Sequence, residues 1–139
     1  MATTTATLTL TSTDLLTESF ASTSTATLWK AGSTEGLDQV RMGRNEVPTG
    51  TSFDLIDATA LAQDKANKLY VCNNSTDETY YVTIMIDAQA IGRLYAGDWM
   101  FIPWVAEDAT ADLEIESADG TNKITYIIFH EGRTLPAVD

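Results

Sequence analysis

The sequence predicts an all-β protein, a β-sandwich or jelly roll built from short antiparallel strands with little helix. Three observations favour this fold class. Apolar and polar residues alternate at period two in short runs along most of the chain. Clusters of Gly, Asn, Asp and Ser separate these runs at intervals of about 8–12 residues, a spacing typical of sandwiches. The runs themselves are rich in threonine and aromatic residues, which suit strands.

Length, composition and charge limit the classes of protein that this chain can be. Its 139 residues fit one domain, and 44% of them are hydrophobic, enough for a packed core. Twenty acidic residues against 8 basic ones give a formal net charge of −12. Such a balance argues against direct binding of nucleic acid and against docking on anionic membranes. It favours solubility and repulsion between copies.

The first twenty residues do not resemble a signal peptide, because they lack a basic start and a continuous apolar stretch. The chain contains no apolar run of about 18 residues, the length that a membrane-spanning helix needs. We therefore expect a protein that is made in a cytoplasm and is not exported by the standard secretory route.

Residues 1–30 form a threonine-rich segment that we interpret as a strand or arm, part of the sandwich or docking on it. Ala6, Leu8 and Leu10 alternate with threonines, so one face of this strand is apolar and the other is hydroxylated. A short strand or one helical turn is expected at residues 15–20, and a further alternating run at 25–30. Because the segment is only weakly apolar, we expect an edge strand or an arm that orders against a neighbour.

Residues 31–132 are expected to form the sandwich, and residues 133–139 a C-terminal tail. The segment 31–36 reads as a turn, 43–50 as a polar loop, 57–68 as an Ala-rich stretch with one or two helical turns, and 105–110 as an acidic loop. Tight turns are expected at Asp87-Ala88 and at residues 118–122, where Asp-Gly is a hairpin signal. The strands are expected at residues 37–42, 52–56, 68–72, 79–86, 90–95, 99–104, 112–116 and 123–130, giving nine to eleven in all.

The strongest strand pattern lies at residues 79–86. One face carries Tyr80, Val82, Ile84 and Ile86, and the other Tyr81, Thr83 and Met85. Because both faces are largely apolar or aromatic, we expect this strand at the centre of a sheet or at a subunit interface. Gly92 is expected at a bulge in the next strand, and Pro103 on an edge strand.

An aromatic group lies between residues 80 and 104. Such residues would suit stacking on a sugar, as in carbohydrate-binding modules, but they more often belong to a core or a subunit interface. The group consists of Tyr80, Tyr81, Tyr95, Trp99, Phe101 and Trp104.

No catalytic or metal-binding constellation is evident. Cys72 is the only cysteine and lies in an alternating run, so we expect a small buried hydrophobe with no internal disulfide. His130 is the only histidine and ends a strand. One His and one Cys do not make a zinc site, and no motif places a nucleophile beside His130. We expect no enzymatic activity, no cofactor and no metal.

Two groups of charged residues have a structural and a functional interpretation. Asp112, Glu114 and Glu116 recur at every second position and are expected to form a solvated acidic stripe; a weak calcium site or a glycosidase carboxylate pair are the alternatives. Arg41 and Arg44 form a rare basic pair. They are either solvated or a docking contact for an acidic partner surface.

Two stretches carry a family resemblance, IGRLYAGDWMFIPW at residues 91–104 and YIIFHEG at 126–132. Together they resemble small virion structural proteins of tailed bacteriophages, in which a strand–turn–strand ending in FIP is closed by a later strand ending in EG. The alternating opening TLTLTSTD at residues 7–14 is similar to such proteins as well. The resemblance implies a β-sandwich that assembles as an oligomer, commonly a homotrimer, on the outer capsid surface of the virion.

The role that this resemblance implies is capsid decoration, as a cement protein that bridges subunits of the major capsid protein and resists the pressure of packaged DNA. On this hypothesis the residues for fold and subunit packing are Tyr80, Tyr81, Trp99, Phe101 and Trp104. The strand at residues 5–10, with Leu8 and Leu10, and the pair Arg41 and Arg44 are the candidates for lattice contact. The alternatives are a receptor- or glycan-binding sandwich of a tail or head fibre, and a small hydrolase, which would need a nucleophile beside His130.

Overall fold

A computed structural model describes residues 3–15, 17–61, 65–106 and 112–131. Ten strands and one short 3-10 helix lie in these ranges, which confirms the all-β fold class and the expected number of strands. None of the helical structure described there is long and apolar enough to cross a membrane. The expected tail at residues 133–139 and most of the expected acidic loop at 105–110 lie outside the described residues.

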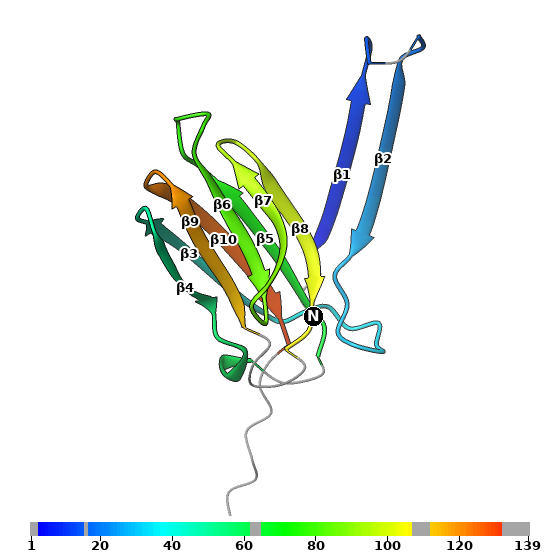
Figure 1. Cartoon of the computed structure of the whole chain (residues 1–139). Coiled ribbons are helices and arrows are strands. Elements are labelled where there is room, and N and C mark those ends of the chain that lie inside the picture. Colours follow the sequence, from blue (N-terminus) through cyan, green and yellow to red (C-terminus); the bar gives the residue numbers. More distant parts are fainter. Residues whose placement is uncertain (1–2, 16, 62–64, 107–111, 132–139) are drawn as a thin grey trace, which may run out of the picture.

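The first two strands form a hairpin that stands away from the rest of the molecule, β1 (Thr5–Ser12) paired with β2 (Phe20–Thr27) (Figure 1). We call this hairpin the arm. The expected strand or helical turn at residues 15–20 is wrong. The Ser12 hydroxyl accepts a hydrogen bond from the backbone N–H of Leu15 at 3.1 Å, so the chain turns here and returns as β2.

The other eight strands build a two-layered jelly roll (Figure 1). One sheet has the order β3-β10-β5-β8 and the other the order β4-β9-β6-β7. Each layer pairs antiparallel strands in a nested way: β6 with β7, β5 with β8, β4 with β9 and β3 with β10. The strands are β3 (Gln39–Val47), β4 (Thr51–Ile56), β5 (Asn67–Asn73), β6 (Tyr81–Ile86), β7 (Gln89–Tyr95), β8 (Trp99–Trp104), β9 (Leu113–Asp119) and β10 (Asn122–His130).

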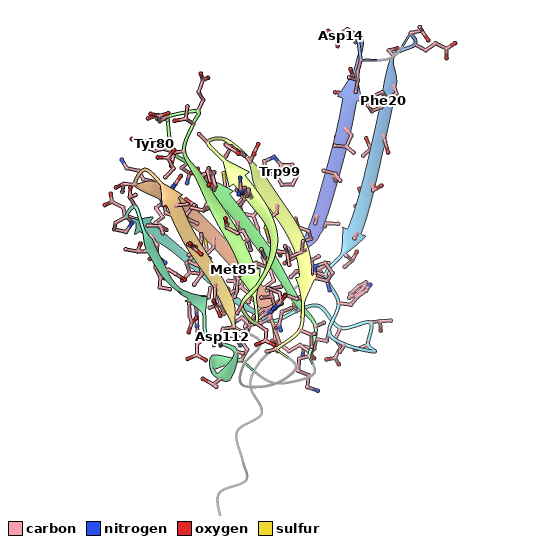
Figure 2. The ribbon with its side chains drawn as sticks, in the orientation of Figure 1. Asp14, Phe20, Tyr80, Met85, Trp99 and Asp112 are labelled. Atoms are coloured by element: carbon pink, nitrogen blue, oxygen red, sulfur yellow. The ribbon has the colours of Figure 1, made fainter. Side chains whose placement is uncertain are left out.

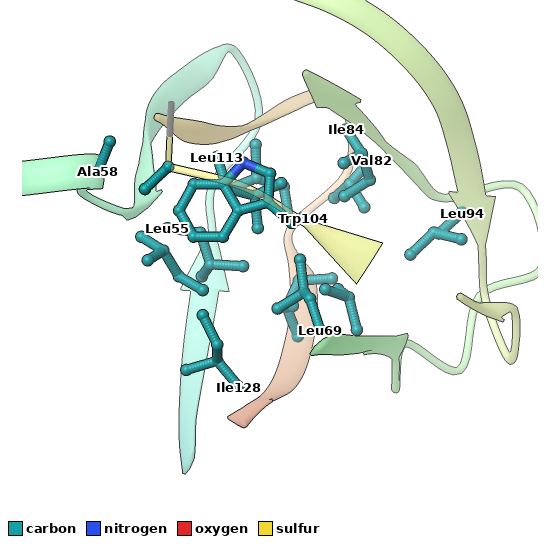
Figure 3. Close-up of a cluster of buried hydrophobic side chains, with 14 of the residues drawn as sticks. Leu55, Ala58, Leu69, Val82, Ile84, Leu94, Trp104, Leu113 and Ile128 are labelled. Carbon is teal, nitrogen blue, oxygen red and sulfur yellow. The ribbon is translucent and has the colours of Figure 1, made fainter. Parts of the chain in front are cut away.

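The core fills the space between the two sheets, with side chains that alternate inward along each strand (Figure 3). Val82 and Ile84 of β6, Ile115 of β9 and Leu69 of β5 are fully buried. The expectation that residues 79–86 form a central strand is confirmed, because β6 lies between β9 and β7. Edge strands are β3 and β8 in one sheet, so Pro103 lies on an edge strand as expected.

Buried amides join the two sheets at one end of the sandwich. Asn73 of β5 and Asn122 of β10 have fully buried side chains, and the Asn73 Nδ2 donates to the Asn122 Oδ1 at 3.0 Å. Asn73 also donates to the carbonyl of Leu94 at 2.9 Å, and Asn122 to the carbonyl of Tyr81 at 3.0 Å. Both carbonyls belong to the opposite sheet. The two side-chain amides therefore form hydrogen bonds that connect one sheet to the backbone of the other.

One expected strand differs from the structure. It was expected at residues 37–42, whereas β3 begins at Gln39 and continues to Val47, so most of the expected loop at 43–50 is strand. In the described part of the Ala-rich stretch, the 3-10 turn Ala58–Ala60, capped by Asp57, agrees with the expected one or two helical turns. The Asp57 carboxylate accepts hydrogen bonds from the Thr59 hydroxyl at 2.6 Å and from the Thr59 N–H at 2.8 Å, which lower the pKa of Asp57.

The tight turn expected at Asp87-Ala88 is confirmed. Both residues have positive φ, 50° and 60°. Two central residues with positive φ describe a type I′ turn, whose twist matches that of the flanking strands. The expected bulge is also present in β7, where Ile91 is the extra residue between Gly92, opposite Ile84, and Ala90, opposite Met85.

The left-handed backbone of Ala88 predicts that Ala88→Gly stabilises the protein. Glycine adopts positive φ without the steric cost that alanine has, so we expect the free energy of unfolding to rise by about 0.5–1 kcal/mol. Denaturant unfolding followed by circular dichroism measures this change. Ala90→Gly, inside β7, is the matched control and should destabilise by a similar amount. A loss of stability in Ala88→Gly would contradict the prediction.

Candidate functional site: an apolar sheet face beside the arm

The outer face of the sheet β3-β10-β5-β8 carries a row of apolar side chains that crosses all four strands. The register places Met42 opposite Ile127, Ile127 opposite Tyr70, and Tyr70 opposite Phe101. Two further positions extend this row on the same face. Val40 of β3 lies opposite Phe129 of β10, and Trp99 of β8 lies opposite Cys72 of β5. We call this surface the apolar platform: Val40, Met42, Tyr70, Trp99, Phe101, Ile127 and Phe129.

The platform is open to solvent over much of its area. Met42 is 67% exposed, Val40 58% and Trp99 50%, and the other four side chains are half-buried. The rings of Tyr70 and Trp99 lie 6.3 Å apart between centroids. A contiguous apolar surface of this kind is uncommon on a monomer and typically marks a binding site.

The outer face of the other sheet is acidic. Glu114 and Glu116 of β9 point outward at its centre, beside Asp54 of β4 and Thr83 of β6. Partial burial raises the pKa of Asp54, and the nearby carboxylates of Asp112 and Asp57 raise it further. The two outer faces of the sandwich therefore differ in chemistry, one apolar and one anionic.

The arm has two faces as well. The face that we call apolar carries Ala6, Leu8 and Leu10 from β1 with Phe20 and Ala26 from β2, together with the small polar residues Ser12, Ser22 and Ser24. Leu8 is 40% exposed, Leu10 52% and Phe20 38%. The opposite, threonine face pairs hydroxyls across the strands. Thr7 and Thr25 lie 3.2 Å apart between Oγ1 atoms, and Thr9 and Thr23 3.4 Å apart.

A groove separates the arm from the platform. It has a volume of about 470 Å³ and is lined by Leu8 and Ala26 of the arm and by Tyr70, Trp99 and Phe101 of the sheet. Trp99 projects from β8 into the space between the sheet and the arm, while Asp14 and Phe20 lie near the arm's far end (Figure 2). Residues from both faces of the arm line this groove, Leu8 and Ala26 from one face and Thr7 and Thr25 from the other.

Charged residues border the end of the platform away from His130. A second groove of about 600 Å³ is lined there by Arg44 and Glu46 of β3, Lys123 of β10, Tyr70 and Cys72. Asn74 also lines it, and this side chain bonds to the Thr125 hydroxyl and accepts from the Cys72 thiol at 3.3 Å. A side-chain hydrogen bond with Cys72 raises the pKa of Tyr70, and partial burial raises it further.

The base of the arm is held together by contacts with the segment that leads into β3. Leu28 and Leu37 are buried and joined by a backbone hydrogen bond of 2.9 Å, and Leu28 N–H also donates to Thr4. Lys30 forms ion pairs with Glu35 at 3.3 Å and Asp38 at 3.1 Å.

A carboxylate completes this anchor. The Glu131 Oε2 atom accepts from the backbone N–H groups of Ala31 at 3.3 Å and Ala66 at 2.9 Å. These contacts set the direction in which the arm leaves the sandwich.

The structure brings together only some of the candidate residues. Leu8, Trp99 and Phe101 line the groove, and Leu10 lies on the same face of β1. The other aromatic candidates lie elsewhere, so a single aromatic cluster is wrong. Trp104 is 4% exposed and belongs to the core, because it faces inward on β8.

The tyrosine candidates belong to the other sheet. Tyr81 packs against Tyr95 with ring centroids 5.2 Å apart, and the guanidinium carbon of Arg93 lies 4.5 Å above the Tyr81 ring. Tyr80 precedes β6, and its ring covers Gly120 in the β9–β10 turn. Neither tyrosine contributes to the platform.

Arg41 and Arg44 do not form one patch, although both side chains are exposed and their docking role stays a prediction. Both lie on β3, and three positions along a strand place two side chains on opposite faces. Arg44 lies on the platform side, opposite Thr125, whereas Arg41 has the inward register, opposite the buried Ile128.

Cys72 and His130 do not meet. Cys72 is half-buried on the outer face of its sheet. The expectation that it is a buried residue is therefore wrong. Its partner Thr125 lies five positions before His130 on β10, about 17 Å along the strand. The His130 Nδ1 lies 3.1 Å from the backbone oxygen of Glu131. This separation excludes a Cys–His pair.

The acidic stripe is confirmed for Glu114 and Glu116 only. Asp112 precedes β9 and its Oδ1 accepts from the backbone N–H of Ala58 at 2.7 Å, so this carboxylate fastens the 3-10 turn. Among the described residues, no group of three or more His, Cys, Asp or Glu side chains is placed to hold a metal ion.

Comparisons with known proteins give little beyond the fold. The sequence matches no protein family and no curated protein. Among solved structures, a cupin protein from Bacteroides fragilis is similar over 79% of this chain and 81% of that chain, with 20% identity and a TM-score of 0.43. The fold class rests on the strand order of the two sheets, which is that of a jelly roll.

Proposed function

We propose that this chain is a non-enzymatic capsid decoration protein of a tailed bacteriophage, a cement protein that binds the lattice of the major capsid protein on the outer surface of the virion. One observation carries the proposal: an uncovered apolar platform and the uncovered apolar face of an arm lie on the same side of the sandwich. Surfaces of this kind support protein–protein association. The resemblance of residues 91–104 and 126–132 to virion proteins supplies the capsid as the setting.

The distribution of charge supports the same role. The formal net charge of −12 keeps free copies apart, and the anionic outer face of β4-β9-β6-β7 would remain toward solvent when the platform side is bound. A homotrimer would multiply weak lattice contacts into stable binding. Binding to an assembled lattice would stabilise the head by mass action.

Sedimentation with capsids tests this function. Purified protein is mixed with heads of the parent phage that lack it, and bound chains are counted per capsid over a range of protein concentrations. We expect saturation at a fixed ratio of decoration subunits to capsid subunits, and heads that withstand higher temperature when saturated. Heads that bind no protein, or bind it without saturation, would overturn the proposal.

Removing residues 1–12 is expected to weaken binding to capsids at least tenfold, because this segment contains β1 with Leu8 and Leu10. The sandwich should remain folded and unfold cooperatively, since its eight strands form two sheets without β1 and β2. The measurement is the same sedimentation assay. Unchanged affinity in the shortened chain would show that the arm takes no part in capsid binding.

A second candidate function is a receptor- or glycan-binding sandwich of a phage fibre. The groove favours it, because two aromatic side chains, Tyr70 and Trp99, lie opposite the hydroxyls of Thr7, Ser24 and Thr25. Sugars bind by stacking on such rings. Saccharide binding on a glycan array that is lost in Trp99→Ala, together with no binding to capsids, would favour this candidate.

A further inference from the structure

We propose that the arm of one copy lies on the apolar platform of a second copy of this chain, so that copies are joined by exchanged arms. The inference deepens the proposed function, on which it rests, by assigning the contact that holds the copies together. It names the two surfaces in contact: the apolar face of β1 and β2, and the outer face of β3-β10-β5-β8.

Among the described residues, neither surface is fully covered in the single chain. The arm's own groove touches the platform only through β5 and β8, where Tyr70, Trp99 and Phe101 lie. No platform residue of β3 or β10 lines the groove beside the arm. Val40 and Met42, in that half of the platform, are more than half exposed. The chain thus offers one apolar strand pair and one apolar sheet face that do not cover each other.

The arm leaves the sandwich from an ordered base. Leu28 and Leu37 are buried there, and the Glu131 carboxylate accepts from the backbone N–H of Ala31. In this arrangement a groove of about 470 Å³ lies between the arm and its own sheet. The fixed direction of the arm leaves its apolar face available to another molecule.

The dimensions of the two surfaces agree. A strand of 8 residues such as β1 extends for about 27 Å at 3.4 Å per residue. Four hydrogen-bonded strands at about 4.8 Å spacing place β3 and β8 about 14 Å apart. One arm is therefore long enough to cross the whole platform of a neighbour.

Charge favours a second copy as the occupant. Residues 1–27 contain two charged side chains, Asp14 and Glu18, both acidic and both at the arm's tip. The platform carries the basic residues Arg44, Lys68 and Lys123 at its edges, with the acidic Glu46 opposite Lys123. An arm with an uncharged shaft and an acidic tip can approach this face of another copy, whereas most of the chain's surface would repel it.

The test uses the full chain and measures its mass by light scattering on a size-exclusion column, over a hundredfold range of concentration. We expect a mass that is a multiple of 15.1 kDa at the higher concentrations. The arm variant Leu8→Asp with Leu10→Asp and the platform variant Val40→Asp with Met42→Asp should each run at 15.1 kDa. All four side chains are at least 40% exposed, so each variant should keep the circular dichroism spectrum of the wild type and unfold cooperatively as a folded monomer.

Mixing the two variants distinguishes arm exchange from contact between two platforms. The arm variant keeps an intact platform, and the platform variant keeps an intact arm. Their mixture can form one complete contact, so we expect a species of twice 15.1 kDa that neither variant forms alone. Two platforms packed face to face would give no such rescue, and its absence would overturn the inference. Thr9→Asp with Thr11→Asp, on the threonine face of the same strand, is the matched control and should keep the wild-type mass.

The inference and the proposed function fail in different ways. A wild-type chain of 15.1 kDa at every concentration, or an arm variant with the wild-type mass, overturns arm exchange. If such a monomer still binds capsids and the arm variant does not, the occupant is a lattice subunit, and the capsid role stands. An oligomer held by its arms that binds no capsid would instead overturn the capsid role alone.

Discussion

Asn122→Ala is expected to lower the free energy of unfolding by about 3–5 kcal/mol, the largest loss from any single amide in the chain. The Asn122 Nδ2 group donates to the Tyr81 carbonyl at 3.0 Å and to the Ser117 hydroxyl at 2.8 Å. Its Oδ1 accepts from Asn73 at 3.0 Å and from the Ser75 hydroxyl at 3.2 Å. Alanine would remove all four bonds from a fully buried site, and Asn73, Ser75 and Ser117 would each lose one of their hydrogen-bond partners.

Urea unfolding of Asn122→Ala measures this loss, and Asn74→Ala is the graded control. Asn74 is exposed and bonds to Thr125 and Cys72, so its removal should cost about 1 kcal/mol or less. The ranking of the two variants is the test. Equal costs would mean that water reaches the network and replaces the lost amide, which would contradict its burial.

Ile115→Ala is expected to lower the free energy of unfolding by about 2–5 kcal/mol. Ile115 is fully buried at the centre of β9, where it faces the core between Phe53 of β4 and Ile84 of β6. Removing three carbon atoms loses their transfer free energy and leaves a cavity that two hydrogen-bonded sheets cannot collapse to fill. Denaturant unfolding measures the effect.

Ile91→Ala is the matched control for this substitution. Ile91 is 50% exposed at the bulge of β7, so the same atoms are removed without opening a cavity, and we expect a change within about 0.5 kcal/mol. A large loss in Ile91→Ala would contradict its exposure. A small loss in Ile115→Ala would contradict the packing of the sandwich.

Local signals in the sequence predicted most strands and turns but not the platform. The second half of β3 was also missed, because this strand was assigned only as far as Met42. Its positions beyond Met42 include Gly43, which has no side chain because the Tyr126 ring occupies that space: a Cβ at Gly43 would lie 2.6 Å from the ring. Gly43 and Asn45 occupy inward positions of β3, so apolar and polar residues do not alternate there. Only the outward residues Val40 and Met42 followed the pattern of a strand.

The composition of the platform follows from sheet order, which local patterns do not encode. Met42, Ile127, Tyr70 and Phe101 are far apart in the sequence and meet only because β10 pairs with β3 and β5. Pairing at this range also separates Trp99 from Tyr81, although they are close in sequence. In the same way, Asn73 and Asn122 looked like ordinary turn residues, because burial of an amide depends on carbonyls contributed by the other sheet.

The nested pairing of the strands has a consequence for how the chain folds. β6 and β7 are joined by a two-residue turn, so their contact needs the least loop closure, and each pair outward encloses a longer stretch of chain. The contact of β3 with β10 encloses all the others and forms at the greatest entropic cost. Proteins dominated by such distant pairings fold on a timescale of about milliseconds to seconds. Until β3 closes the roll, the edge of β10 remains open to strands of other chains, and the surplus of acidic residues keeps those chains apart.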